Sequence, residues 1–178
     1  NMQQPSAVLD KSVQRSLPKL SMNGKLNFER DSTLFGGDSL QTLEPQIQYL
    51  YIPYRDQTNI ELFDTARLQD DYYGLFRQNR YSGLDRINDT NQLTLGWTTR
   101  IYDQQDTERF RFSMGQILFL DDPKTEFEVA PGQQPAIAAT ESIFAAETLL
   151  HWQKRWFLNG GVQYDSETKR MVKSNVSL

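Results

Sequence analysis

The side chains best suited to chemistry are sparse in this chain and form no recognisable metal or catalytic set. Its 178 residues contain one histidine, His151, and no cysteine, which excludes disulfides, thiol catalysis and a transition-metal site of histidine and cysteine. Oxygen ligands suited to calcium occur at Asp85, Asn88, Asp89 and Asn91, but their spacing differs from that of the twelve-residue calcium-binding loop. We therefore expect no metal and no cofactor, and an interfacial or structural role for His151.

Adjacent acidic residues do not form a catalytic pair either. Asp70-Asp71 and Asp121-Asp122 fall in predicted loops, where solvent keeps both carboxylates ionised and gives them no separate acid and base roles. Ser82-Gly83 and Gly36-Gly37 match neither a nucleophile elbow nor a phosphate-binding loop. The sequence predicts that the protein is not an enzyme, and we assign no catalytic residue.

The overall composition predicts a folded protein without a nucleic-acid partner. Aromatic residues make up 12% of the chain, and its 19 basic and 23 acidic residues are mixed along it. No apolar run is long enough for a membrane-spanning helix, and we expect any export signal to be cleaved or to lie outside this sequence. A mean hydropathy of -0.65 does not exclude a β-barrel, because barrel strands carry apolar side chains on one face only.

The sequence predicts β-strands as its main elements, because seven segments alternate apolar and polar residues with a period of two. In Lys19 to Glu29 the apolar set is Leu20, Met22, Gly24, Leu26 and Phe28. The other predicted strands are residues 40–52, 91–102, 107–120, 142–152, 156–165 and 171–178. Pro45 lacks a ladder donor and predicts a bulge or an unpaired edge, Gln116 breaks the alternation, and residues 142–152 also fit a short helix.

The connections between these strands differ in length, which favours one architecture. Residues 103–106 and 153–155 form tight turns, whereas 53–90 and 121–137 are long loops. Because outer-membrane barrels have short periplasmic turns and long extracellular loops, we expect residues 31–39 and both tight turns in the periplasm. Strands of roughly 10 residues, with aromatic residues near their ends, fit a tilted crossing of the membrane.

The expected fold class is all-β, an antiparallel transmembrane β-barrel segment of about seven strands from a larger barrel. Residues 1–16 would be an extracellular loop or N-terminal extension, and residues 17–178 the partial barrel. An odd number of strands predicts a piece of a barrel whose open edges pair with strands elsewhere.

Several segments resemble one family. The longest are residues 43–57 (LEPQIQYLYIPYRDQ), 75–89 (LFRQNRYSGLDRIND) and 91–96 (NQLTLG), with shorter ones at 27–31 (NFERD), 99–103 (TRIYD) and 160–165 (GGVQYD). They resemble the lipopolysaccharide-assembly outer-membrane proteins, the LptD family, also called organic solvent tolerance proteins (OstA or Imp). The resemblance covers most of the chain from Leu17 onward.

This resemblance implies a very large barrel in the cell outer membrane that inserts lipopolysaccharide into the outer leaflet. The implied partners are lipopolysaccharide, the plug lipoprotein LptE in the lumen, the periplasmic Lpt bridge and outer-membrane lipid. This sequence lacks the family's periplasmic β-jellyroll domain and its disulfide cysteines, so those features are not carried over.

Two groups of residues are candidate sites within such a barrel. On the predicted polar face, Lys25, Arg100, Arg109 and Arg111 can attract a phosphorylated sugar, because guanidinium groups hold phosphate through two hydrogen bonds. The simpler alternative, that these charges pair with one another or are solvated, carries more weight. In the long loop, a second group can fold over the lumen or contact the plug, or can pack on neighbouring loops: Tyr54, Arg55, Asp56, Arg77, Asn79, Arg80, Asp85 and Arg86.

A soluble alternative shares the same strand pattern. It is an antiparallel β-sandwich or lipocalin-like barrel that binds a carbohydrate or lipid. The direction of the apolar face distinguishes the two folds, since these side chains point outward in a membrane barrel and inward in a soluble one: Leu26, Phe28, Leu95, Trp97, Phe112 and Val162.

Overall fold

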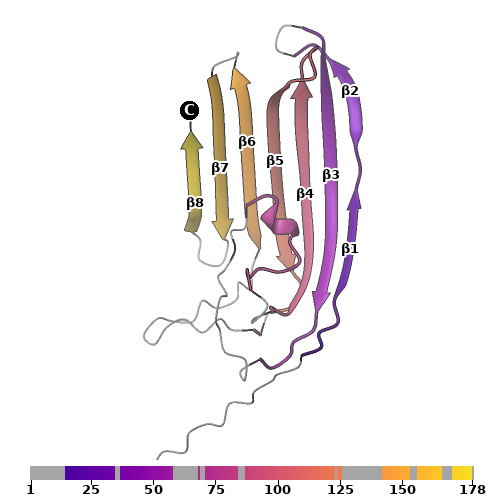
Figure 1. Ribbon diagram of the computed structural model, residues 1–178, viewed down its shortest axis with the longest axis vertical. Helices are drawn as coiled ribbons and strands as arrows, with labels where there is room; N and C mark the ends of the chain where they lie inside the picture. Colours follow the sequence, from indigo (N-terminus) through magenta and orange to yellow (C-terminus); the bar gives the residue numbers. More distant parts are fainter. Residues whose placement is uncertain are drawn as a thin grey trace, which may run out of the picture.

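The computed structural model describes residues 15–34, 37–57, 68, 71–83, 87–122, 124–125, 142–152, 156–165 and 170–177. Within these residues the chain forms one antiparallel sheet of eight strands (Figure 1). The elements are β1 (Leu20–Lys25), β2 (Phe28–Ser32), β3 (Ser39–Ile52), the 3-10 helix η2 (Gly74–Phe76), β4 (Thr90–Tyr102), β5 (Glu108–Phe119), β6 (Ile143–Trp152), β7 (Trp156–Asp165) and β8 (Arg170–Ser177).

The sheet is a meander in which strands that follow one another in sequence are mostly neighbours. Its order is β1-β3-β4-β5-β6-β7-β8, and β2 pairs with β3 beyond the end of β1. Figure 1 shows the sheet curving, with β8 at one edge and β1 and β2 at the other. The all-β, antiparallel prediction is confirmed, and residues 143–152 form a strand rather than the alternative short helix. Among the described residues we find no helix of the length and apolarity needed to cross a membrane.

The first predicted strand is divided in two because of Pro45. Lys25 pairs with Gln46 and Phe28 pairs with Leu43, so the alignment with β3 is the same on both sides of the break. The Leu26 amide donates to the Pro45 carbonyl at 3.1 Å. The reciprocal bond is absent because proline has no N–H, and this loss separates β1 from β2 without shifting the register.

The turn between β4 and β5 contains a β-bulge. Ile101 pairs with Phe110 but Tyr102 pairs with Glu108, which leaves Arg109 as the extra residue. In the turn, the Asp103 carboxylate accepts hydrogen bonds from the backbone N–H groups of Gln105 at 2.9 Å and Thr107 at 3.0 Å. Arg109 therefore belongs to the turn end of the hairpin rather than to the regular alternation of β5.

The two faces of the sheet have opposite polarity. On the inner face, which η2 covers, β3 and β4 bury mostly polar side chains such as Gln48 (2% exposed) and Thr94 (0% exposed). On the outer face the register places large apolar side chains, and many are strongly exposed, such as Met22 (63%) and Leu26 (61%). This distribution is the reverse of that in a water-soluble sheet, whose buried face is apolar.

Residues 71–83, the covering segment, lie over the inner face. Leu75 is fully buried there and forms the apolar core with Ile117, Ile143 and Ala145. Two glycines make room for the segment, because a Cβ at Gly96 would lie 2.9 Å from a ring atom of Phe76 and one at Gly115 would lie 3.0 Å from Leu75. Hydrogen bonds fix it to β4 and β6, from the Thr94 hydroxyl to the Leu75 carbonyl at 3.3 Å and from the Tyr72 amide to Glu147 at 3.1 Å.

Candidate functional site

The inner face carries alternating charges across four strands, which we call the charge ladder: Lys25, Glu44, Arg100, Glu108 and Arg111. Lys25 in β1 contacts the Glu44 carboxylate at 2.7 Å, and Arg100 in β4 pairs with the same carboxylate. Glu108 in β5 lies 3.2 Å from Arg100 and 3.6 Å from Arg111. The ladder thus joins strands that are far apart in sequence through two carboxylates.

The register explains why the second carboxylate is needed. Arg100 and Arg111 are directly opposite one another on β4 and β5, a position at which like charges destabilise a sheet. The bulge at Arg109 brings Glu108 opposite Tyr102 on the inner face, and there it contacts both guanidinium groups. The carboxylate therefore compensates the repulsion of the two arginines.

Glu44 is the most buried member of the ladder. Its side chain is 7% exposed, compared with 52% for Lys25, and it also accepts a hydrogen bond from the Thr42 hydroxyl at 3.3 Å. A buried carboxylate is stable only with partners of opposite charge and with hydrogen bonds, and Glu44 has both. The ladder is consequently anchored at β3, while its ends at Lys25 and Arg111 reach toward solvent.

Neutral polar groups occupy the inner face beside the ladder. Thr98 and Ser113 share a hydrogen bond of 2.9 Å between β4 and β5, and Thr90 donates to Gln92 at 2.8 Å. Gln48 Oε1 is buried without a hydrogen-bond partner among the described residues. The inner face therefore presents hydrogen-bonding groups on β3, β4 and β5 beside the ladder.

The structure brings together three of the four basic residues predicted on the polar face. Lys25, Arg100 and Arg111 belong to the ladder, whereas Arg109 lies at the bulge and pairs with Asp103 at 3.8 Å. Every one of the four has a carboxylate partner. Neither Glu44 nor Glu108 was predicted as a site residue. Glu44 lies on the polar face of the predicted strand 40–52, which was a signal that could have identified it, whereas regular alternation places Glu108 in step with Phe110 and only the bulge brings it to the inner face.

The residues predicted in the long loop are distributed over two places. Tyr54, Arg55 and Asp56 are exposed just beyond the end of β3. In the covering segment, Arg77 lies 3.5 Å from Asp71. Tyr54, Arg55 and Asp56 therefore add polar surface beyond the end of β3, whereas Arg77 belongs to the segment that covers the inner face.

Asn79 and Arg80 also belong to the covering segment. The Asn79 amide donates to the Gly83 carbonyl at 3.4 Å. The Arg80 guanidinium lies over the ring of Phe119, 5.4 Å from its centroid, which is within the range of a cation–π contact. Asp85 and Arg86 lie outside the described residues.

Several oxygen-rich residues near the end of this loop make hydrogen bonds to the chain itself. Asp89 Oδ1 accepts hydrogen bonds from the Thr125 amide at 2.7 Å and its hydroxyl at 2.6 Å, and Oδ2 accepts one from the Lys124 amide at 2.9 Å. The Asn91 amide donates to Asp121 at 2.5 Å. His151 Nδ1 lies 2.7 Å from the Glu108 carbonyl. In the part of the chain that the structure describes, no cluster of three or more potential metal ligands occurs.

Fold and site together define a class: an antiparallel strand meander with a polar, charged, covered face and an apolar, uncovered one. Residues 1–178 match the LptD family, described as LPS transport system D. The chain belongs to this family, as the resemblance in the sequence predicted.

Individual relatives carry the same name. The chain is 50% identical over 169 residues to the LPS-assembly protein LptD of Pseudoalteromonas translucida, and the match covers 94% of this chain. It is 47% identical over 172 residues to that of Shewanella frigidimarina, covering 97%, and 42% identical over 170 residues to that of Escherichia coli K12, covering 96%. The chain spans about 22% of the length of each of these relatives.

Proposed function

We propose that this chain is part of a β-barrel in the cell outer membrane, and that the complete barrel inserts lipopolysaccharide into the outer leaflet. The observation that carries the proposal is the reversed polarity of the sheet. Monomeric soluble proteins rarely expose large apolar patches, yet β1, β2, β3, β4, β6 and β7 all carry exposed large apolar side chains on the outer face. Lipid is the medium in which such a face is stable and in which the polar face must be enclosed.

Strand lengths and aromatic positions support the same proposal. β4 has 13 residues, β5 has 12, and β6 and β7 have 10 each, which is enough for a tilted strand to cross the hydrocarbon. Trp152 and Trp156 pair at the shared end of β6 and β7, and Trp156 is 65% exposed. Tryptophan at strand ends fits the aromatic belt at a membrane interface.

The inner face supports the passage of a polar, anionic head group. An amphiphile that crosses between compartments needs a hydrogen-bonding path for its sugars and phosphates and an apolar path for its acyl chains. The charge ladder offers cations at its solvent-accessible ends, Lys25 and Arg111, which can exchange a carboxylate partner for a phosphate. Arg109, at the bulge, can take part at the turn end of the same face.

The partners in this proposal come from the family. They are lipopolysaccharide, the plug lipoprotein LptE, the periplasmic Lpt bridge and outer-membrane lipid. Tyr54, Arg55, Asp56 and the polar residues of the covering segment are the part of this chain that we assign to contact with the plug or the head group. The soluble sandwich alternative requires Phe28 and Leu95 in a core, whereas both are exposed on the outer face.

The experiment is charge reversal in the complete protein. In cells whose only copy carries Arg111→Glu, we expect several-fold less lipopolysaccharide at the cell surface, because the reversed charge repels a phosphorylated head group. Arg111→Lys is the matched control and should retain delivery. Barrel abundance and heat-modifiable gel mobility establish that both variants fold.

Two results would count against the proposal. If the Arg111→Glu protein folds, reaches normal abundance and leaves surface lipopolysaccharide unchanged, the polar face does not contribute to lipopolysaccharide passage in the way we propose. If the complete protein is soluble and monomeric without detergent, the proposal of a membrane barrel is wrong.

A further inference from the structure

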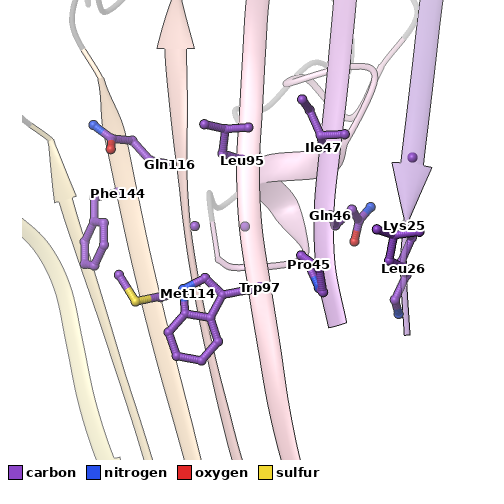
Figure 2. Close-up of a pocket in the computed structure, with 13 residues that line it drawn as sticks. Lys25, Leu26, Pro45, Gln46, Ile47, Leu95, Trp97, Met114, Gln116 and Phe144 are labelled. Atoms are coloured by element: carbon purple, nitrogen blue, oxygen red, sulfur yellow. The ribbon is translucent and has the colours of Figure 1, made fainter. Parts of the chain in front are cut away.

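A groove crosses the outer face at right angles to the strands, and we call it the acyl groove (Figure 2). Its two walls are successive rows of cross-strand neighbours. One row contains Ile47, Leu95, Gln116 and Phe144, and the other contains Leu26, Pro45, Trp97 and Met114. The cavity between the rows measures about 670 Å³.

The floor of the groove is open because of strand geometry. The residues between the two rows, Lys25, Gln46, Gly96 and Gly115, belong to the inner face by alternation and present only backbone to the outer face. In β1, Gly24 stands opposite Ile47 where the first row would continue, and it has no side chain to close that end. In Figure 2 the side chains of Gln116, Leu95 and Ile47 form one row and those of Met114, Trp97 and Pro45 form the other, with Phe144 at one end of the space between them.

The chemistry of the walls is that of a hydrocarbon site. Gln116 supplies the single amide, and no charged side chain rises from either row. Lys25, in the floor, is engaged with Glu44 on the inner face. The Trp97 ring also contacts Phe112, with ring centroids 5.5 Å apart, which fixes one wall.

The dimensions of the acyl groove fit one extended hydrocarbon chain rather than a protein partner. Five strands at a spacing of about 4.8 Å give a length of roughly 19 Å, and two residues along a strand give a width of about 7 Å. The footprint, on the order of 130 Å², is far below the roughly 800 Å² per partner that a stable protein interface buries. The length accommodates one extended acyl chain, since a single leaflet of hydrocarbon is about 15 Å deep.

We propose that the acyl groove is a defined binding site for one acyl chain of a membrane lipid. The proposal rests on the proposed function, in that the outer face must contact lipid. It goes further, because it assigns a preferred position to one chain where the rest of the outer face meets lipid without preference. Dispersion contacts with two walls and a floor distinguish this position from the open surface, where a chain contacts one side only.

The test uses the complete protein in phosphatidylcholine vesicles that contain a small fraction of phospholipid with a photoactivatable diazirine in its acyl chain. After irradiation, adducts are mapped by mass spectrometry. We expect about fivefold more adducts at Trp97, Met114 and Phe144 than at Leu158 and Val162, which lie on the outer face of β7 outside the groove. A fivefold preference corresponds to about 1 kcal/mol.

Two variants make the comparison specific. Gly24→Phe places a ring at the open end of the groove, where a Cβ lies at an ordinary 3.4 Å from Ile47, and should lower labelling of the wall residues to the level of β7. Val162→Phe adds the same ring to the outer face outside the groove and should leave wall labelling unchanged.

The outcomes separate this proposal from the one on which it rests. Even labelling of the walls and β7 would overturn the acyl groove and leave lipid contact of the outer face intact. Absence of labelling at both places would overturn the membrane barrel as well. Adducts between proteins at the walls would assign the groove to another polypeptide and also overturn the proposal.

Discussion

Replacing Leu95 by arginine would place a cation near the middle of the outer face. Leu95 lies five residues after Thr90, where β4 begins, and seven before Tyr102, where it ends. At about 3.4 Å per residue and a tilt of about 45°, these separations correspond to roughly 12 Å and 17 Å along the membrane normal. If the outer face contacts lipid, the new cation is therefore close to the bilayer midplane.

The expected loss is large only in lipid. Arginine on the lipid face at the midplane of a barrel costs about 2–4 kcal/mol, which lowers the folding equilibrium constant by about 30- to 900-fold. The same substitution at an exposed position in water stays within about 0.5 kcal/mol. Because the Leu95 side chain is exposed, its replacement removes no core packing, and the difference between the costs in lipid and in water can be attributed to the new charge.

The assay is urea-dependent folding of the complete protein into lipid vesicles, with the folded fraction read from heat-modifiable gel mobility. Leu120→Arg is the matched control, because Leu120 is also exposed but lies just past the end of β5, where the expected cost is about 0–1 kcal/mol. Equal effects of the two substitutions, both near zero, would refute a lipid-facing outer surface.

Four further predictions address the inner face and the tight turn. Glu44→Ala removes the shared partner of two cations and should lower the free energy of unfolding by about 3 kcal/mol in the same titration, since the other carboxylate of the ladder remains; a change below 1 kcal/mol would mean that the ladder is weakly coupled. Gly96→Val should overpack the covering segment by about 1–3 kcal/mol and speed its amide hydrogen exchange, whereas Gly24→Val on the outer face should not; unchanged exchange would contradict the close approach. Asp106 has a φ of 56°, so Asp106→Gly should stabilise the turn by about 0.5 kcal/mol, and a loss of stability on urea unfolding would show that its side chain matters more than its backbone. Hydrogen bonds from backbone N–H groups of the turn, that of Thr107 first, hold the pKa of the Asp103 carboxyl below its ordinary 3.8. The stabilisation that these bonds give the folded state is therefore fully present above pH 3.8 and is lost as the pH falls through the lower pKa of the folded state. The pH dependence of the Asp103 carboxyl chemical shift measures that pKa, and Asp103→Asn should abolish the pH dependence of stability that Asp103 contributes.

Alternation in the sequence predicted the strands and, away from the bulge at Arg109, the two faces. The period of two assigns each side chain to a face without knowledge of its neighbours, and the strand bounds differ from the predicted ones by about a residue in most cases. The break opposite Pro45 was also predictable from the sequence, because the hydrogen-bond donor that proline lacks affects only the strand pairing next to it. The division into β1 and β2 makes eight strands rather than about seven.

The composition of the site depends on register, which alternation does not determine. Glu44 becomes the partner of Lys25 and Arg100 only through the alignment of β1, β3 and β4. Arg109 was predicted beside Arg111, but the bulge removes it from that row. The position of the covering segment on the inner face could not be predicted from alternation either. It depends on Gly96 and Gly115 being neighbours on adjacent strands, which only the register shows.

The ion pair between Lys25 and Glu44 flanks the place where Pro45 weakens the ladder of backbone hydrogen bonds. A slip of β3 by one residue would reverse every side chain, turning Glu44 toward the apolar side and Ile47 toward the polar side. The strand would then present an unpaired carboxylate to hydrocarbon. The ion pair thus favours the observed alignment at the point along β3 where Pro45 leaves a backbone hydrogen bond unmade.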